Sequence, residues 1–399
     1  MSVGFRVDVA VLLGGVLLAV GVVASGIAAR YRVPSLLLFL GLGMLVADDG
    51  LALIRFDDVA LAQDIAVVAL LVILFEGGLT TDPAAFRRAG LPAVALSTLG
   101  VVITAGVVGL AAWWLLGLSA STALLLGSVI ASTDAAAVFA AVRSEPLPPR
   151  VRDLLTLESG LNDPVAVMLT IGMVEVWRAD TSALDWVGFV SLQLLGGIAI
   201  GLATGIVARW AVRRFDEVLA SSYGVFTLGI AGVTYGLAAL TGASGFLAVY
   251  LAGVVLTSAR RPQPGLLSFH EGLASTAQAV LFLLLGLLVF PSQLLDDLGQ
   301  AVVVTAVLVL IARPTAVHAV LTPFGVPQRE SVLVSWAGLR GAVPVVLATI
   351  PLTAGHPDGS LVFDVAFVVV VISVALQAPL VAPLAQRLGL EATADGDRA

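Results

Sequence analysis

Two residue types are missing from this chain of 399 residues. It has no cysteine, which excludes disulfides, catalytic thiolates and cysteine-ligated metal sites. It has no lysine either, so its 20 basic residues are all Arg, against 27 acidic residues and a net charge of -7. A nucleic-acid-binding protein is not expected from this balance. The only three His, at positions 270, 318 and 356, are too scattered for a metal-ligand pair, so no zinc or haem cofactor is expected.

Charge of either sign is also scarce. Charged residues make up 12% of the chain and hydrophobic residues 59%, with a mean hydropathy of +1.07. An ordinary soluble domain carries about twice that charge. A single membrane span of about 20 residues would be diluted by the rest of such a chain. Most of the sequence is therefore expected to lie in lipid.

Apolar segments of helical length follow one another along the chain. The first, Val9 to Ala29, is longer than the apolar region of a cleavable signal peptide and is expected to be retained. Alternating strands of about ten residues are absent, which excludes a barrel. The thirteen predicted helices are 8–29, 34–48, 61–79, 91–116, 119–142, 150–176, 186–210, 220–240, 243–259, 271–290, 298–321, 328–352 and 361–386. The expected fold class is an all-α polytopic membrane protein.

The distribution of Arg predicts the orientation. Taking loops on alternate sides, one side collects fourteen Arg and the other three, together with most acidic loop residues. The arginine-rich side is expected to be cytoplasmic. The sequence therefore predicts a multi-pass protein of the cell (inner) membrane, with its amino terminus outside and its carboxyl terminus in the cytoplasm.

The two halves of the chain echo each other weakly. The run from Pro34 resembles the run from Ala243 in size pattern and in position. Six helices, a linker helix and six helices would give two repeats of opposite topology, an arrangement frequent in secondary transporters. The expected organisation is a transmembrane domain over 1–390, with repeats at about 8–176 and 220–386, a linker helix at about 186–210, and a short cytoplasmic tail at 391–399.

Ionisable residues near the membrane midplane are candidates for function, because burying them costs several kcal/mol unless they are paired or hydrated. Glu76, Asp134, Asp163 and Arg340 qualify by depth, and Glu158 lies nearer the end of its helix. Glu76 could instead be a carboxylate that reaches the membrane surface. Arg313 has no evident partner in the sequence, and a structural role is expected for it.

Two of the predicted helices should be interrupted. Ala131-Ser-Thr-Asp-Ala135 offers Ser and Thr caps in the fifth helix, and Gly338-Leu-Arg-Gly-Ala-Val-Pro344 combines two Gly with a Pro in the twelfth. They occupy corresponding places in the two halves. An Asp near a half-helix amino terminus and an Arg near a half-helix carboxyl terminus would offset the exposed helix dipoles. The alternative is a pair of kinks stabilised by one ion pair.

The sixth helix carries Leu157-Glu-Ser-Gly-Leu-Asn-Asp-Pro164. Ser159 and Asp163 are four residues apart and share one helix face, while Glu158 and Asn162 share the adjacent face. Carboxylate, hydroxyl and freed carbonyl oxygens are the ligands that hard cations prefer. This pattern predicts an all-oxygen site for an alkali cation, although a protonated, purely structural Asp163 is an alternative.

These three stretches in this order resemble the monovalent cation/proton antiporters, in the branch with an Asn-Asp pair, and most of all the bacterial potassium/proton antiporters. The resemblance covers about residues 10 to 390. It implies that Asp163 binds either the cation or the proton, that Ser159 and the Thr133 carbonyl are cation ligands, and that Asp134 and Glu76 contribute nearby. It further implies a supporting network of Asn162, Arg340 and Glu158. A homodimer with a mobile core is implied as well.

A charge count predicts the stoichiometry. If Asp163 alone exchanges one proton for one monovalent cation, the moving site carries the same charge both ways, and Asn162 adds no second titratable carboxylate. The sequence thus predicts electroneutral exchange of K⁺, or of Na⁺, for H⁺, by a transporter that is not an enzyme and needs no cofactor. The alternatives are a passive cation channel and an intramembrane aspartyl protease, although the chain lacks the Gly-x-Gly-Asp pattern of such proteases.

Overall fold

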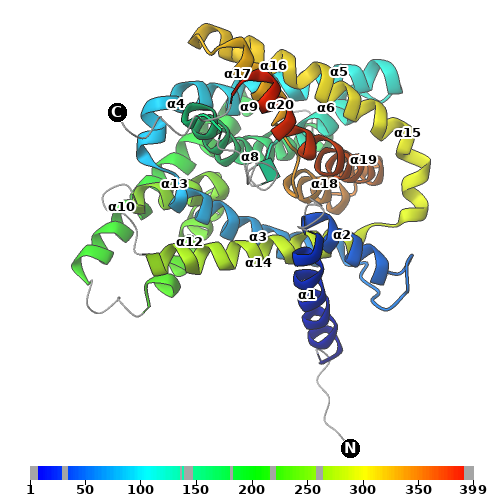
Figure 1. Cartoon of the computed structure of the whole chain (residues 1–399), viewed down its shortest axis with the longest axis horizontal. Coiled ribbons are helices and arrows are strands. Elements are labelled where there is room, and N and C mark those ends of the chain that lie inside the picture. Colours follow the sequence, from blue (N-terminus) through cyan, green and yellow to red (C-terminus); the bar gives the residue numbers. More distant parts are fainter. Residues whose placement is uncertain are drawn as a thin grey trace, which may run out of the picture.

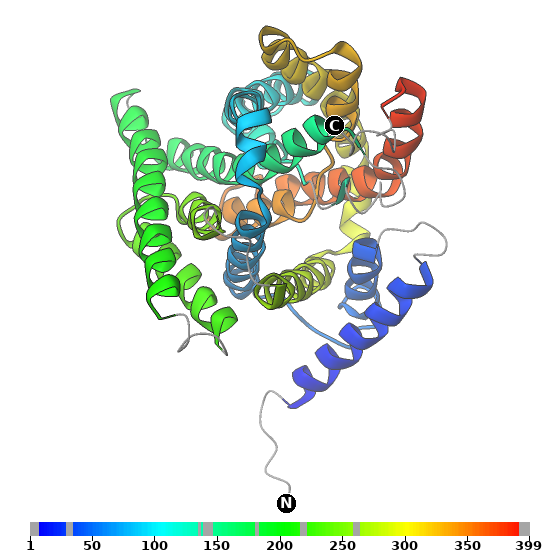
Figure 2. The ribbon, with the colours of Figure 1, turned by 60° about the vertical axis from the view of Figure 1, so that its left-hand side comes forward.

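The computed structural model describes residues 8–28, 35–134, 137–138, 147–179, 183–215, 222–257 and 264–390. Every regular element in these ranges is a helix, and they contain no strand. The predicted all-α class is therefore confirmed. Figures 1 and 2 show a bundle of crossing helices from which α1 projects. The predicted tail, 391–399, lies outside the described residues.

The helices of the first half and the linker are α1 (Asp8–Ala28), α2 (Ser35–Val46), α3 (Val59–Thr80), α4 (Pro83–Ala95), α5 (Val101–Leu116), α6 (Ala120–Val129), α8 (Pro149–Arg178), α9 (Ala183–Ser191) and α10 (Gly197–Arg214). Those of the second half are α12 (Tyr223–Leu240), α13 (Gly245–Thr257), α14 (Pro264–Leu288), α15 (Pro291–Val307), α16 (Arg313–Leu321), α17 (Gln328–Trp336), α18 (Val343–Thr353), α19 (Gly359–Ile372) and α20 (Val381–Leu388).

Short π-helical turns join several of these helices into longer ones. They occur at Leu96–Gly100, Leu192–Gly196, Leu308–Ala312 and Ser373–Gln377. Counting across such turns, seven helices of the described residues are long and apolar enough to cross a membrane, and further apolar helices are shorter. The chain is thus a multi-pass membrane protein. Each of the thirteen predicted segments contains helix, while the number of crossings stays a prediction.

Three predicted helix starts are wrong by about two turns. The tenth and eleventh helices were expected to begin at about residues 271 and 298, but α14 begins at Pro264 and α15 at Pro291. The fourth helix was expected to begin at about residue 91, but α4 begins at Pro83. The Asp82 carboxylate accepts a hydrogen bond from the Ala84 N–H (2.9 Å), and Pro83 occupies the first turn, where its missing N–H costs nothing. This capping outweighs the polarity of Arg87 and Arg88, so the helix extends beyond its apolar stretch.

Loops that were assigned to the outer side meet at one end of the bundle. The Asp49 carboxylate accepts a hydrogen bond from the Ser292 N–H (2.8 Å) at the start of α15, and this bond lowers the pKa of Asp49. Nearby ends are joined by Thr122, which donates to Asp358 (2.7 Å). At the end assigned to the cytoplasm, Arg88 lies between Asp82 and Asp153. These contacts agree with the predicted alternation of sides.

Two pairs of helices, α2 with α14 and α3 with α13, cross at close range. In α2 and α14, a methyl group at Gly43 would collide with the Leu283 carbonyl, and one at Gly286 with the Leu40 carbonyl. In α3 and α13, Gly78 and Gly253 meet each other's backbones in the same way. Glycine is needed at these four positions because backbone packs directly on backbone.

Candidate functional site

Both predicted interruptions are present. Helix α6 ends at Val129, and residues 131–134 have no regular secondary structure. The Asp134 carboxylate accepts a hydrogen bond from the Ala137 N–H (3.3 Å). Helix α17 ends at Trp336, and α18 begins at Val343. Each break leaves helix-end N–H and C=O groups in the interior of the bundle, where charged or polar side chains can meet them.

The two breaks touch each other. The Asp134 N–H donates to the Leu339 carbonyl (2.8 Å), which joins the interruption in the first half to that in the second. The Asp134 carboxylate lies against Gly341, where any side chain would collide with it. The small residue at 341 is thus explained by close approach of a carboxylate.

Helix α8 supplies polar side chains to this crossing, near the middle of the bundle (Figure 1). The Asn162 amide donates to the Thr133 hydroxyl (2.6 Å), which also lies 3.3 Å from the Ser159 hydroxyl. All three side chains are buried. Ser159, from the predicted face that it shares with Asp163, and Asn162, from the adjacent face, therefore both meet the first break at Thr133.

Asp163 follows Asn162 directly on α8. Its side chain is 7% exposed, and its Oδ1 has no hydrogen-bond partner among the described residues. Asp134 is close enough to act on it electrostatically. A buried, incompletely paired carboxylate beside a second one is unfavourable unless a cation or a proton compensates it.

Arg340 lies in the second break, as predicted. Its N–H donates to the Ser373 hydroxyl (2.9 Å), and its guanidinium donates to the Gly338 carbonyl (2.8 Å) close to the end of α17. The side chain is 1% exposed. A cation at a helix carboxyl terminus is favourable, so Arg340 compensates carbonyls that the interruption leaves exposed.

Arg313 has a partner that the sequence did not reveal. Its guanidinium forms an ion pair with both carboxylate oxygens of Glu158, at 2.5 and 2.8 Å. The side chains are 3% and 0% exposed, respectively. The pair joins α16 to α8, so Glu158 belongs to the architecture that holds α8 in place.

Glu76 stands apart from this group. It is half-buried on α3, and the contacts that the structure gives it within the described residues are with Thr80 and, electrostatically, with Glu271. Neither residue belongs to the group around Asp163. Its predicted contribution to ion binding stays a prediction.

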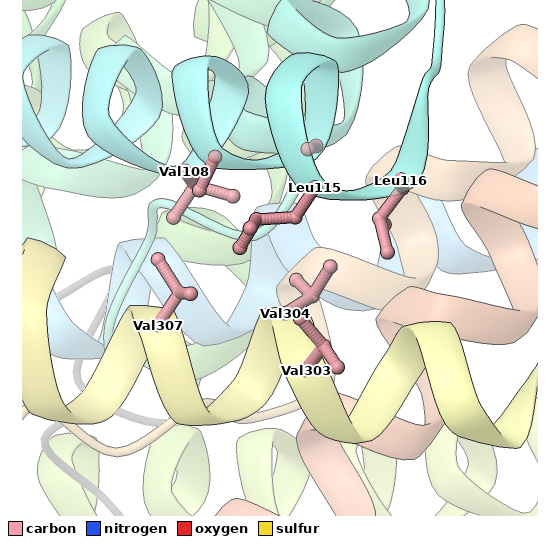
Figure 3. Close-up of a pocket in the computed structure, with 8 residues that line it drawn as sticks. Val108, Leu115, Leu116, Val303, Val304 and Val307 are labelled. Carbon is pink, nitrogen blue, oxygen red and sulfur yellow. The ribbon is translucent and has the colours of Figure 1, made fainter.

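A pocket between α5 and α15 is not a candidate for the ion site. Figure 3 shows it between α5 and α15, and its walls are Val, Leu and Ala side chains only. It offers no oxygen ligand and cannot hold a desolvated cation.

The hydroxyl of Thr133 can be tested separately from the carboxylate. We expect Thr133→Val to raise the half-saturating cation concentration about tenfold, because the Asn162 amide loses its acceptor and the polar group loses one oxygen. The measurement is the cation dependence of proton flux in proteoliposomes. Thr170→Val removes a buried hydroxyl, also on α8, that has no hydrogen-bond partner among the residues that the structure describes, and it should leave the value unchanged. Equal effects would argue against a role of Thr133 in the site.

Crossed helix breaks at the centre of a polytopic bundle, with a buried carboxylate beside them, define the class: a secondary transporter of the cation/proton antiporter kind. The family described as "Sodium/hydrogen exchanger, transmembrane" matches residues 15–387, and the chain belongs to it. The resemblance predicted from the three motifs is confirmed. Among solved structures, the sodium proton antiporter MjNhaP1 from Methanocaldococcus jannaschii has the same fold, with a TM-score of 0.82 and 23% identity over 96% of this chain and 99% of that one.

Relatives with similar sequences carry names for both cations. The chain is 45% identical to the K(+)/H(+) antiporter NhaP of Alkalimonas amylolytica over 96% of its length, and 38% identical to the K(+)/H(+) antiporter NhaP2 of Shewanella baltica over 92%. It is 28% identical to the Na(+)/H(+) antiporter ApNhaP of Aphanothece halophytica over 94%. It spans 68%, 64% and 73% of the length of these three relatives, respectively.

Proposed function

We propose that this protein exchanges K⁺ for H⁺ across the cell membrane, one for one, with both ions competing for Asp163. The observation that carries the proposal is the Asp163 carboxylate, nearly buried at the crossing of two broken helices, with one oxygen unpartnered. A carboxylate in that setting binds a compensating cation or a proton, and binding of one excludes the other. The preference for K⁺ over Na⁺ rests on the names of the relatives with the higher identities.

The ligand set is part of the proposal. Asp163, Ser159 and the Thr133 carbonyl would hold the cation, with Asp134 and Glu76 contributing nearby. Asn162, Arg340 and Glu158 would position these groups. The hydrogen bond from Asn162 to Thr133 supports the assignment, because it holds the non-helical segment 131–134 against α8.

Electroneutrality follows from the charges at the site. Asn162 is neutral and donates a hydrogen bond through its amide, so Asp163 is the group that changes partner. A proton and a monovalent cation carry the same charge, and the moving site therefore crosses with the same net charge in either direction. Antiport of this kind is insensitive to membrane potential.

Topology and assembly complete the proposal. The proposal keeps the two inverted repeats and the linker helix at their predicted boundaries. The paired Gly crossings of α2 with α14 and of α13 with α3 support the repeats, because in each crossing the second helix of one half packs on the third helix of the other. We further propose an inner-membrane location with the amino terminus outside, and a homodimer in which a core moves against a scaffold.

The test is exchange in proteoliposomes that contain a pH dye. Adding K⁺ outside should drive protons out of the liposomes, and liposomes without protein should show no such efflux. Clamping the membrane potential should leave the rate of proton efflux unchanged. A response to Na⁺ alone would reverse the selectivity and keep the mechanism. Current without a proton gradient would favour the channel, and peptide cleavage by purified protein would favour the protease.

A further inference from the structure

A further buried carboxylate, Asp364, lies away from the crossing. Asp364 belongs to the first two turns of α19, and its side chain is 9% exposed. The structure gives it no hydrogen bond and no ion pair in the described part of the chain. A carboxylate in this condition is costly to bury, so its presence calls for a compensating charge.

The space beside Asp364 is large enough for a ligand. A cavity of about 150 Å³ is lined by residues from the ends of α3, α14, α15, α18 and α19, among them Gln293, Ser360 and Asp364. That volume holds several water molecules. All its walls come from the end of the bundle where the predicted outer loops meet. Its polar lining is a carboxylate, an amide and a hydroxyl, and it contains no Arg or His.

The electrostatic surroundings favour a cation. Asp297, on α15, is close enough to act on Asp364 electrostatically, so the negative potentials of two carboxylates add at this cavity. The described residues contain no group of three or more His, Cys, Asp or Glu side chains placed to hold a metal ion. One buried carboxylate with neutral oxygens matches a monovalent cation that keeps part of its water, rather than a divalent one.

We propose that this cavity is an outer site for the transported monovalent cation, with Asp364 as its anionic ligand and Gln293 and Ser360 as neutral oxygen ligands. The inference rests on the proposed function and extends it, because it places a loading site on the outer side, separate from Asp163. The cavity lies where α3 and the end of α14 face α18 and α19. In the proposed transporter, predicted helices four to six and eleven to thirteen form the moving core, which includes α18 and α19, while α3 and α14 belong to the scaffold. An ion held in the cavity therefore lies at the boundary between core and scaffold.

A direct test uses the absence of native cysteine. The Val59→Cys protein carries a single thiol at the cavity wall and keeps all three proposed ligands, and Val59 is partly exposed, so the thiol can be labelled. In purified protein in detergent, K⁺ at ten times its dissociation constant should slow maleimide labelling about tenfold relative to choline, by mass action. Adding Asp364→Asn should remove this protection. Labelling that ignores K⁺, or protection that survives Asp364→Asn, would overturn the proposal.

Two controls sharpen the result. Asp296→Asn removes the same charge from an exposed position on α15, and protection should persist, which separates a site from a general surface potential. If Asp364→Asn does not fold, Gln293→Leu leaves the carboxylate in place and should still weaken protection severalfold. Full protection in that variant would count against the ligand set.

Sidedness gives a second readout. In right-side-out vesicles, Asp364→Asn should raise the half-saturating outer K⁺ concentration about tenfold, the loss expected for one charge-assisted contact, while activation from the cytoplasmic side stays unchanged. Equal weakening on both sides would contradict an outer site. Labelling needs no transport, so protection without exchange would refute the proposed function alone.

Discussion

Replacing Asp163 by Asn is expected to abolish cation/proton exchange. The amide has nearly the shape of the carboxylate, but it neither releases a proton near neutral pH nor compensates the charge of a bound cation. Asp163 is 7% exposed, so water cannot take over that compensation, and a cation without a counter-charge would face a desolvation penalty of several kcal/mol. Proton flux driven by K⁺ or Na⁺ should fall to the level of liposomes without protein.

The comparison requires a variant that changes charge in the same helix. Asp153→Asn makes the same replacement on α8, where Asp153 pairs with Arg88 near the amino-terminal end of the helix. That variant should retain exchange. Both proteins are reconstituted at equal amounts, and dye signals are compared after addition of each cation. An Asp163→Asn protein that still exchanges ions would refute competition at this carboxylate.

Binding can be measured without transport. A ligand at one hundred times its dissociation constant stabilises the folded state by about 2.7 kcal/mol. Thermal unfolding of the wild-type protein in detergent should therefore shift upward when K⁺ replaces choline. The Asp163→Asn protein should show no such shift, and its unfolding curve also reports that the variant is folded.

The interrupted helices could be predicted because their causes are local. Pro344 and two neighbouring Gly disfavour a continuous helix within seven residues of sequence, and Ser-Thr-Asp before residue 135 supplies caps. The shared face of Ser159 and Asp163 follows from helical spacing alone. The contact between the two breaks could not be predicted. The hydrogen bond from Asp134 to Leu339 depends on how two segments that are distant in the sequence cross.

The pair formed by Glu158 and Arg313 shows where such reasoning ends. Its members are 155 positions apart, on helices whose order in space no periodicity encodes. A site at Asp364 could not be predicted for a different reason. Nothing near Asp364 in the sequence suggests a site, and its cavity is formed by five helix ends. Alternation of charge predicted the sides of the loops but not which loops meet.

Breaking the buried ion pair of Glu158 and Arg313 should cause the largest loss of stability. Glu158→Gln leaves the Arg313 guanidinium unpaired at 3% exposure, and breaking one side of a buried ion pair costs about 3–5 kcal/mol. The transition temperature in detergent, followed by the fluorescence of the six Trp, should fall by about 10 °C on the scaling for chains of a few hundred residues. The loss should appear with or without K⁺.

The same helix offers the control. Glu175, also on α8, pairs with Arg178 at 3.6 Å with both side chains about half exposed. Such surface pairs contribute about 0–1 kcal/mol, so Glu175→Gln should barely change the transition. Equal losses for Glu158→Gln and Glu175→Gln would contradict the burial argument.

Removing both charges separates the fold from the transport chemistry. Glu158→Gln combined with Arg313→Met leaves no unpaired charge, and buried pairs replaced by neutral residues of similar size often lose little stability. The double variant should regain most of the lost transition temperature. If exchange returns with it, the pair serves the packing of α8 on α16. If stability returns without exchange, the pair also positions Arg340, because both members act on that guanidinium electrostatically. The Glu158–Arg313 pair then belongs to the transport mechanism.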